Sequence, residues 1–378
     1  VTMKFQADRE VLSDAVSFLV RLLSPRPQLP QLSGVMIEAD GNEVQLSIFD
    51  YEVAARVKIA AAIDTPGKVL VQARLLSEIL SKLPAASVSM ELDETRFHVN
   101  SGSSKFSLSS MSTTDYPDTP EFPVATGKVS ANEFTNGVAK VAVAASREEV
   151  TPVLTAVMIT ASSKELTMVS TDRFRVAVKV IPWAGKSVDR EVLIPARVLS
   201  EISKTFSHDS ELELGFGEGE KDMIGFSSAN KSVSTATIKG KYPAVLQLFP
   251  EETASFAILS KQELLDATRR VALVVDREKP LRYKFSENEL SLESIGSDVA
   301  DASEQVSCSM KGEETVVSLR PQFLTDALAG LDVENVKIGF TVNPNNPNKP
   351  GPVLISPVDP KDSDKDFKYL LQPNLLVS

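Results

Sequence analysis

One strand-into-helix phrase recurs along this chain, and the repeat limits the folds it can adopt. Residues 69–79 read VLVQARLLSEI and residues 192–202 read VLIPARVLSEI. A more divergent third copy, VSLRPQFLTDAL, occupies 317–328. In each copy a short apolar run leads into a segment with apolar residues at helical spacing, which predicts a strand followed by an amphipathic helix. The sequence therefore predicts three copies of one folding unit.

A second repeated feature precedes each phrase. Ser130-Ala-Asn-Glu133 and Ser260-Lys-Gln-Glu263 have the pattern of a capping box, which begins a helix. The first copy has Asp8 at the matching place, and an aspartate can cap a helix as a serine does. The helices that follow are predicted over about 11–23, 133–145 and 263–275. Two independent elements at matching offsets support a threefold repeat.

Proline-rich connectors separate the copies. DYPDTPEFP at 115–123 and KYPAVLQLFP at 241–250 each carry Tyr-Pro followed by Phe-Pro. Prolines in this pattern favour extended chain over helix. We therefore expect three domains, at 1–125, 126–252 and 253–378.

The segments between the predicted helices are typical of strands. VMIEADGNEVQLSIFD at 35–50 and VMITASSKELTMVSTD at 157–172 alternate or cluster apolar residues around turn-forming residues. The predicted fold class is α+β, with three repeated domains in each of which two helices pack on an antiparallel sheet.

Composition excludes several classes of protein. A single cysteine, Cys308, cannot form an intramolecular disulfide, and His98, His208 and Cys308 lie too far apart for a zinc motif. We expect no metal and no cofactor. No apolar run approaches the roughly 20 residues that cross a bilayer. With an opening unlike a secretory signal, this favours a cytoplasmic protein without a membrane partner.

The net charge of −11 argues against a protein that is basic all over, yet it leaves room for one basic face. The chain also lacks a recognisable catalytic arrangement. Asp172 with Arg175, and the adjacent Glu148 and Glu149, have no nucleophile, histidine or metal ligand beside them in the sequence. We therefore predict that the protein is not an enzyme.

Several motifs resemble one family. MKFQADRE at 3–10, RPQLP at 26–30, STDRFRVAV at 170–178 and the repeated Tyr-Pro and Phe-Pro joints are similar to those of the bacterial DNA polymerase III β subunit, the sliding clamp. The resemblance covers essentially the whole chain. It implies a homodimeric ring of six similar domains that encircles double-stranded DNA and tethers the polymerase III α subunit, the clamp loader and other replication or repair proteins through short linear motifs.

The resemblance implies that basic residues on or beside the repeated helices meet DNA phosphates. A sliding contact needs scattered positive charge and no base contacts. The alternative is that such residues belong to ordinary surface pairs, as Glu78 and Lys82 would, four positions apart. The candidates for DNA contact are Arg26, Arg74, Lys82, Arg147, Arg197 and Lys204.

The resemblance also implies a peptide-binding groove between the second and third domains. Its residues would be Leu154, Thr171, Arg173, Phe174, Arg175, Val176, Pro243, Gln247, Leu248, Phe323, Val353, Gln372, Pro373, Asn374 and Leu375. The alternative for apolar members such as Leu154 and Val176 is that they are ordinary core residues. In a dimer, Phe106 and Leu108 of one chain would face Val274 and Val275 of the other.

This chain departs from the family pattern in the groove. Arg173 and Phe174 stand where Gly-His is frequent, Gln247 stands where Arg is frequent, and Gln372 and Asn374 stand where Met is frequent. Because methionine makes an adaptable apolar lip, these changes bear on which partner motifs the groove accepts. The leading hypothesis is a processivity clamp, and the rival is a three-domain protein-binding scaffold that does not encircle DNA.

Overall fold

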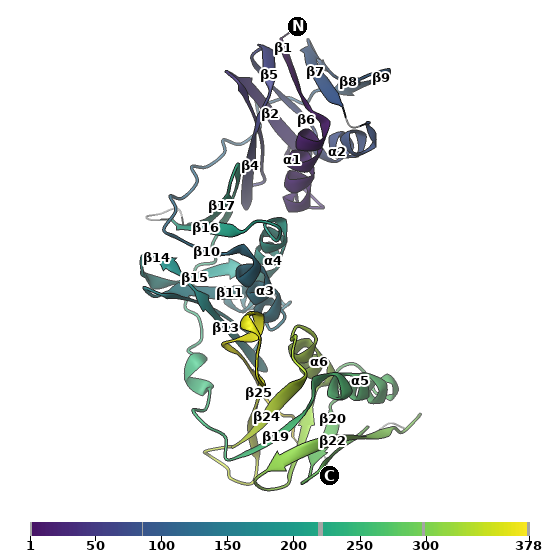
Figure 1. Ribbon diagram of the computed structural model, residues 1–378, viewed down its shortest axis with the longest axis vertical. Helices are drawn as coiled ribbons and strands as arrows, with labels where there is room; N and C mark the ends of the chain where they lie inside the picture. Colours follow the sequence, from purple (N-terminus) through teal and green to yellow (C-terminus); the bar gives the residue numbers. More distant parts are fainter. Residues whose placement is uncertain (1, 85, 218–221, 297–298, 376–378) are drawn as a thin grey trace. The chain divides into compact units, whose positions relative to one another are not determined.

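The structure is a computed structural model, and it describes all residues except 1, 85, 218–221, 297–298 and 376–378. The chain divides into two compact units (Figure 1). The first unit comprises Val1–Asn132 and Glu201–Thr237, and the second comprises Glu133–Ser200 and Ile238–Ser378. Each unit is described below by itself.

The described residues form six α-helices, and their positions confirm the repeated pattern. They are α1 (Arg9–Leu22), α2 (Ala73–Lys82), α3 (Ala131–Ala142), α4 (Ala196–Thr205), α5 (Lys261–Val271) and α6 (Pro321–Ala329). The helices α2, α4 and α6 each follow a strand, as the repeated phrase predicts. These strands are β6 (Gly67–Gln72), β15 (Val188–Pro195) and β23 (Thr315–Leu319).

Two of the predicted helix caps are present. The Asp8 carboxylate accepts hydrogen bonds from the backbone N–H of Glu10 (2.8 Å) and Val11 (3.2 Å). The Ser260 hydroxyl accepts one from the N–H of Glu263 (3.2 Å). These contacts satisfy amide groups that have no partner inside the helix, which fixes where α1 and α5 begin.

The first unit contains two antiparallel sheets. One has the strand order β5-β1-β7-β8-β9, and the other includes the run β10-β16-β17-β18-β4-β3-β2-β6. The further strands are β1 (Met3–Asp8), β2 (Gly34–Asp40), β3 (Glu43–Phe49), β4 (Val53–Ala60), β5 (Ala62–Thr65), β7 (Ser87–Asp93), β8 (Arg96–Ser101), β9 (Ser104–Ser109), β10 (Gly127–Ser130), β16 (Glu211–Phe216), β17 (Met223–Ser228) and β18 (Lys231–Ala236).

The second unit contains one antiparallel sheet of twelve strands, in the order β15-β11-β12-β13-β26-β25-β24-β19-β22-β21-β20-β23. Its further strands are β11 (Ala156–Ala161), β12 (Glu165–Thr171), β13 (Arg175–Pro182), β19 (Ser255–Ser260), β20 (Leu281–Phe285), β21 (Glu289–Glu293), β22 (Ser303–Lys311), β24 (Asn335–Val342), β25 (Pro350–Pro357) and β26 (Phe367–Leu371). A two-residue strand, β14 (Ala184–Gly185), follows β13.

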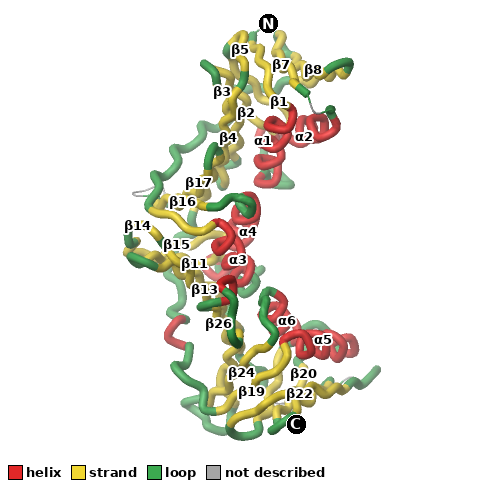
Figure 2. The backbone as a smooth tube through the Cα atoms, in the orientation of Figure 1, coloured by secondary structure: helices red, strands yellow, loops and turns green. Residues whose placement is uncertain are grey.

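Helices pack on the sheets in both units, which confirms the α+β prediction (Figure 2). In the first unit α1 packs beside α2 and against β4. The side chains of Leu12, Val16 and Leu19 on α1 are fully buried, as the helical spacing of these residues requires. In the second unit α5 packs beside α6 and against β22.

A turn of the same construction follows β3 and β12. The Asp50 carboxylate accepts hydrogen bonds from the N–H of Glu52 and Val53, and the Asp172 carboxylate accepts them from the N–H of Phe174 and Arg175. The residue after each aspartate has a left-handed backbone, with φ of 73° at Tyr51 and 80° at Arg173. A left-handed residue suits glycine, so the backbone explains why glycine is frequent at this place in the family that the sequence resembles.

Strand pairing runs across both connectors. Strand β18 pairs with β4, and β13 pairs with β26, so each unit joins segments from either side of an expected domain boundary. The second connector also contains a 3₁₀ turn at Leu246–Leu248, where extended chain was expected. The boundaries near 125 and 252 stay predictions.

No helix in the part of the chain that the structure describes is long and apolar enough to cross a membrane.

Candidate functional sites

The six residues predicted to contact DNA are all exposed. They lie at helix ends or just beyond them: Arg74 and Lys82 on α2, Arg197 and Lys204 on α4, Arg26 after α1 and Arg147 after α3. Lys204 forms an ion pair with Glu201 (3.0 Å). The other five have no carboxylate within 4.0 Å among the described residues, so their charges are available to a ligand.

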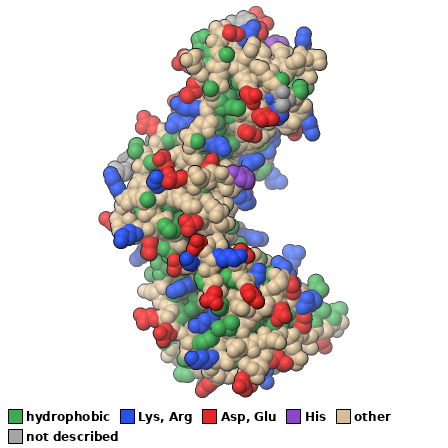
Figure 3. All heavy atoms as spheres, viewed as in Figure 1, with side chains coloured by type: hydrophobic (Ala, Val, Ile, Leu, Met, Phe, Trp, Pro, Cys, Tyr) green, Lys and Arg blue, Asp and Glu red, His purple; other side chains and the backbone are tan. Residues whose placement is uncertain are grey.

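Figure 3 shows Lys and Arg side chains intermingled with Asp and Glu side chains on the face in view.

The residues predicted for the groove fall into three groups by exposure. Leu154, Thr171, Arg175, Val176, Val353 and Pro373 are buried, Phe323 and Asn374 are half-buried, and Arg173, Phe174, Pro243, Gln247, Leu248, Gln372 and Leu375 are exposed. Leu154 and Val176 are therefore part of the apolar core. Leu248 is 54% exposed and Leu375 is 69% exposed, which is unusual for leucine and leaves both side chains free to bind a ligand.

Backbone pairing gathers several of these residues. In the register of β13 with β26, Arg175 lies opposite Leu371, and Leu371 lies opposite Val353 of β25. The N–H of Gln372 donates to the carbonyl of Phe174 (2.8 Å). The C-terminal segment is thus fixed beside the Asp172 turn.

The connector at 241–250 packs against the same strand. Tyr242 and Val245 share an apolar cluster with Val176, and Phe249 packs on its edge. Pro243 and Leu248 stand between these anchored residues, so the chain holds them near β13 with their side chains exposed.

Arg175 is the centre of a buried polar network. Its guanidinium donates to Asp172 (2.9 Å), Asp326 (2.6 Å) and the Tyr369 hydroxyl (3.1 Å). Burial disfavours the charged form, but Tyr369 and the hydrogen bond to Asp326 offset this, so the pKa of Arg175 is raised. Arg175 therefore stays charged and fixes its neighbours.

Arginine and phenylalanine side chains form a stack beside this network. The rings of Phe174 and Phe323 are stacked with centroids 6.3 Å apart. The Arg175 guanidinium lies 4.2 Å from the Phe323 centroid, and Arg320 lies 5.0 Å from that of Phe174. The sequence prediction included both rings and Arg175 but missed Arg320 and Asp326. Their position in the third copy of the repeated phrase, where Arg320 precedes the helix that carries Asp326, was the available signal.

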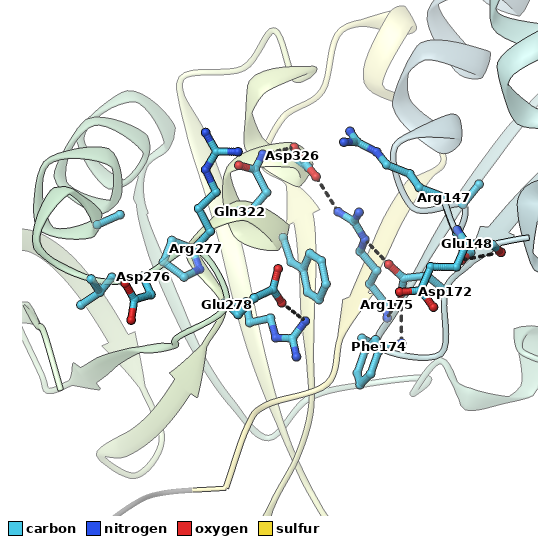
Figure 4. Close-up of a pocket in the computed structure, with 17 residues that line it drawn as sticks. Arg147, Glu148, Asp172, Phe174, Arg175, Asp276, Arg277, Glu278, Gln322 and Asp326 are labelled. Carbon is cyan, nitrogen blue, oxygen red and sulfur yellow. Dashed lines mark hydrogen bonds and ion pairs between the residues drawn. The ribbon is translucent and has the colours of Figure 1, made fainter. Parts of the chain in front are cut away.

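A pocket of about 560 Å³ opens beside this stack (Figure 4). Only Phe174, Arg175 and Phe323 of its lining belong to the predicted groove. The rest of the lining comes from Asp172 in the turn after β12, from the segments after α3 and α5, and from Arg320 with the first turns of α6.

The residues predicted for a dimer contact lie in different units. Phe106 and Leu108 are on β9, which pairs only with β8 among the described strands of its sheet. Phe106 is 39% exposed, whereas Leu108 is buried. Val274 and Val275 are half-buried at the end of the 3₁₀ turn that follows α5. The prediction missed Leu273, whose side chain is 83% exposed.

Within the described residues, no group of three or more His, Cys, Asp or Glu side chains is placed to hold a metal ion.

Comparisons with known proteins cover nearly the whole chain. Models of the N-terminal, central and C-terminal domains of the DNA polymerase III β subunit match residues 3–120, 128–244 and 246–373. The chain is 41% identical to the β sliding clamp of Micrococcus luteus over 82% of this chain and 100% of that one. It is 36% identical to that of Streptomyces coelicolor over 98% and 99%. The crystal structure of the Bacillus subtilis DNA polymerase sliding clamp superimposes with a TM-score of 0.89 and 24% identity, covering all of both chains.

Proposed function

The chain belongs to the family of DNA polymerase III β subunits, the β sliding clamps, and we propose that it is a ring around duplex DNA that tethers replication proteins. The observation that carries the proposal is the run of three β-subunit domains, in family order, along residues 3–373. The proposed role is topological and non-catalytic, and its proposed place of action is the cytoplasm.

DNA would be held by charge alone. Arg26, Arg74, Lys82, Arg147 and Arg197 are exposed and unpaired among the described residues, which supports contact with phosphates. Lys204 is a weaker candidate, because Glu201 offsets its charge.

Two chains would close the ring. Among the described strands, β9 has an open edge, and such an edge presents N–H and C=O groups that can pair with a second chain. We propose that Phe106 and Leu108 meet Val274, Val275 and also Leu273 of the partner, because burying Leu273 and Phe106 would remove two exposed apolar side chains from water.

Partners would bind the second unit through short peptides. The apolar side chains of Phe174, Leu248 and Leu375 are exposed, whereas Val176 and Pro373 of the same predicted groove are buried. This arrangement supports a site for apolar anchors, as peptide grooves use. The proposed partners are the polymerase III α subunit, the clamp loader and other replication or repair proteins.

Retention on DNA of different topology tests the function. After loading, a ring is expected to stay on closed circular DNA and to leave linear DNA through its ends. Equal retention on both would contradict encirclement and favour the rival, a protein-binding scaffold. The family match favours the clamp.

A further inference from the structure

Two lysine side chains are buried beneath the turn that precedes β26. Lys140 on α3 is 7% exposed, and Lys179 on β13 is 2% exposed. The Lys140 Nζ donates to the Ser363 carbonyl, and the Lys179 Nζ donates to the Lys365 carbonyl. Because lysine is almost never buried to this extent unless it is paired, two such side chains under one turn call for a physical explanation.

The two lysines share one buried counter-charge. Lys140 Nζ lies 2.8 Å from the carboxylate of Asp364, which is fully buried. Lys179 has no carboxylate within 4.0 Å among the residues that the structure describes. An unpaired buried charge is costly, so this environment favours Lys179 in its neutral form. A neutral amine still carries N–H donors, and the hydrogen bond to the Lys365 carbonyl therefore does not depend on the charge.

Charged groups face Lys179 from α3 and from the turn. They are Lys140 and Glu133 on α3, and Asp364 and Asp366 in the turn. Burial is the largest cause of the lowered pKa of Lys179, and the Lys140 charge lowers this pKa further. The three carboxylates act in the opposite direction but do not restore the pKa to its usual value.

The other neighbours of Lys179 are uncharged. In the strand register Lys179 lies between Met168 of β12 and Phe367 of β26. On the helix side, a Cβ atom at Gly137 would lie 3.2 Å from Cγ of Lys179, which is closer than such atoms normally approach. Glycine is unfavourable inside a helix, so Gly137 makes room on α3 for a lysine that is buried among apolar groups.

We propose that the turn at 359–366 is a latch on β13, which closes most tightly when Lys179 is neutral and loosens when Lys179 takes up a proton. This turn leads from β25 into β26, so loosening it frees the segment that enters the sheet beside β13. Its backbone favours opening, because Asp359 (φ 46°) and Asp366 (φ 53°) both hold a left-handed conformation.

The direction of the pH dependence follows from proton binding. When the latch opens, Lys179 reaches water and regains its usual pKa of 10.5. Between its lowered pKa in the closed form and 10.5, the open form binds more protons than the closed form. Closure therefore becomes more favourable as pH rises through this window, by up to about tenfold in the opening equilibrium per pH unit.

The first test is a titration of the lysine side chains in the full-length protein, labelled with ¹³C-lysine and followed by NMR through the Cε shifts. One lysine is expected to titrate below the range of the others, and its signal is expected to be missing from Lys179→Met. The proposal is overturned if no lysine titrates early, or if the early one remains in Lys179→Met.

A second variant tests the same assignment without removing Lys179. Lys140→Met removes the neighbouring positive charge and leaves Asp364 without its partner. Both changes are expected to raise the midpoint at which Lys179 titrates. An unchanged midpoint would contradict the shared counter-charge on which the latch depends.

Amide hydrogen exchange tests the latch itself. Exchange of residues 359–371 is measured below and above the Lys179 midpoint and corrected for the intrinsic rate at each pH. Protection is expected to rise with pH by up to about tenfold per unit in the unaltered protein, and to lose this dependence in Lys179→Met. The control is Lys368→Met on β26, where the side chain is exposed, and it should keep the dependence. Protection that is independent of pH in the unaltered protein, or equally dependent on pH in Lys179→Met, would reduce Lys179 to a packing residue and overturn the proposal.

Discussion

The Lys140 ammonium lies 2.8 Å from the Asp364 carboxylate, and both side chains are buried. Lys140 belongs to α3, and Asp364 belongs to a short 3₁₀ turn, Asp362–Asp364, that precedes β26. Lys140 also donates to the Ser363 carbonyl (2.8 Å), and Asp364 accepts from the N–H of Asp332 (2.6 Å). The pair thereby fixes the turn from which β26 enters the sheet beside β13.

Asp364→Asn is expected to lower the free energy of unfolding of the second unit by about 3–5 kcal/mol, because it leaves a buried ammonium without its counter-charge. The chain's one tryptophan, Trp183, is buried in this unit and reports its unfolding in urea by fluorescence. The double variant Lys140→Met/Asp364→Leu is expected to recover most of the loss.

The matched control for this pair is Asp362→Asn. Asp362, two positions before Asp364, forms an ion pair with Lys365 (2.6 Å), and the side chains of Asp362 and Lys365 are both exposed. Its loss is expected to change the stability of the second unit only slightly, because an exposed ion pair contributes little. Equal effects of the two substitutions would mean that the buried pair does not stabilise the turn.

Ionisation of the Tyr283 hydroxyl is expected to lower the stability of the second unit at alkaline pH. Its side chain is fully buried with its hydroxyl 3.3 Å from that of Thr268, and burial raises the pKa of Tyr283 above its usual value of 10.0. As pH rises through 10, the unfolded chain releases this proton first, so stability that is present below pH 10 is lost above it.

Above pH 10 the unfolding free energy of the second unit is therefore expected to fall less steeply with pH in Tyr283→Phe than in the unaltered protein. The difference in slope is up to about 1.4 kcal/mol per pH unit. Trp183 fluorescence measured at half-unit steps from pH 8 to 11 checks this. Tyr51→Phe, in the first unit, is the control and should leave the Trp183 transition as it was. A slope that is identical in Tyr283→Phe and the unaltered protein would contradict the assignment.

Phe106→Asp is expected to convert the proposed dimer into monomers, because a carboxylate at a buried contact would lose its hydration without gaining a partner. Sedimentation equilibrium gives the mass directly. Leu273→Asp should act in the same way if that leucine belongs to the contact. The control is Val124→Asp just after the first connector, where the side chain is 87% exposed. A dimer that survives both Phe106→Asp and Leu273→Asp would rule out this interface.

The sequence predicts the helices well because the signals for a helix are local. The apolar spacing of α1 and its Asp8 cap lie within a few residues of each other, and the structure places both as predicted. Strand pairing between distant segments has no such signal. Nothing near Lys231–Ala236 indicates that β18 pairs with β4, at Val53–Ala60, or that each unit would join parts of two expected domains.

The polar network around Arg175 could not be predicted from the sequence for the same reason. Asp172 is close to Arg175 in sequence, but Asp326 and Tyr369 reach it only through the pairing of β13 with β26 and the position of α6. The groove residues were predicted from the family resemblance, which indicates positions in the sequence but does not indicate whether a side chain is buried or exposed. In the structure the side chain of Val176 is buried, whereas those of Leu248 and Leu375 are exposed.

Leu248 and Leu375 are therefore the sharpest test of the proposed groove. Replacing both with Asp is expected to weaken binding of a Leu/Phe-anchored peptide at least tenfold, because each loses an apolar contact and gains a charge that must be desolvated. Anisotropy measures the loss, and sedimentation should show an unchanged dimer. Val342→Asp, at a side chain that is 66% exposed on β24, serves as the control. Peptide binding that persists in the double variant would move the partner site elsewhere, since these two side chains are the exposed leucines that the groove offers to an apolar anchor.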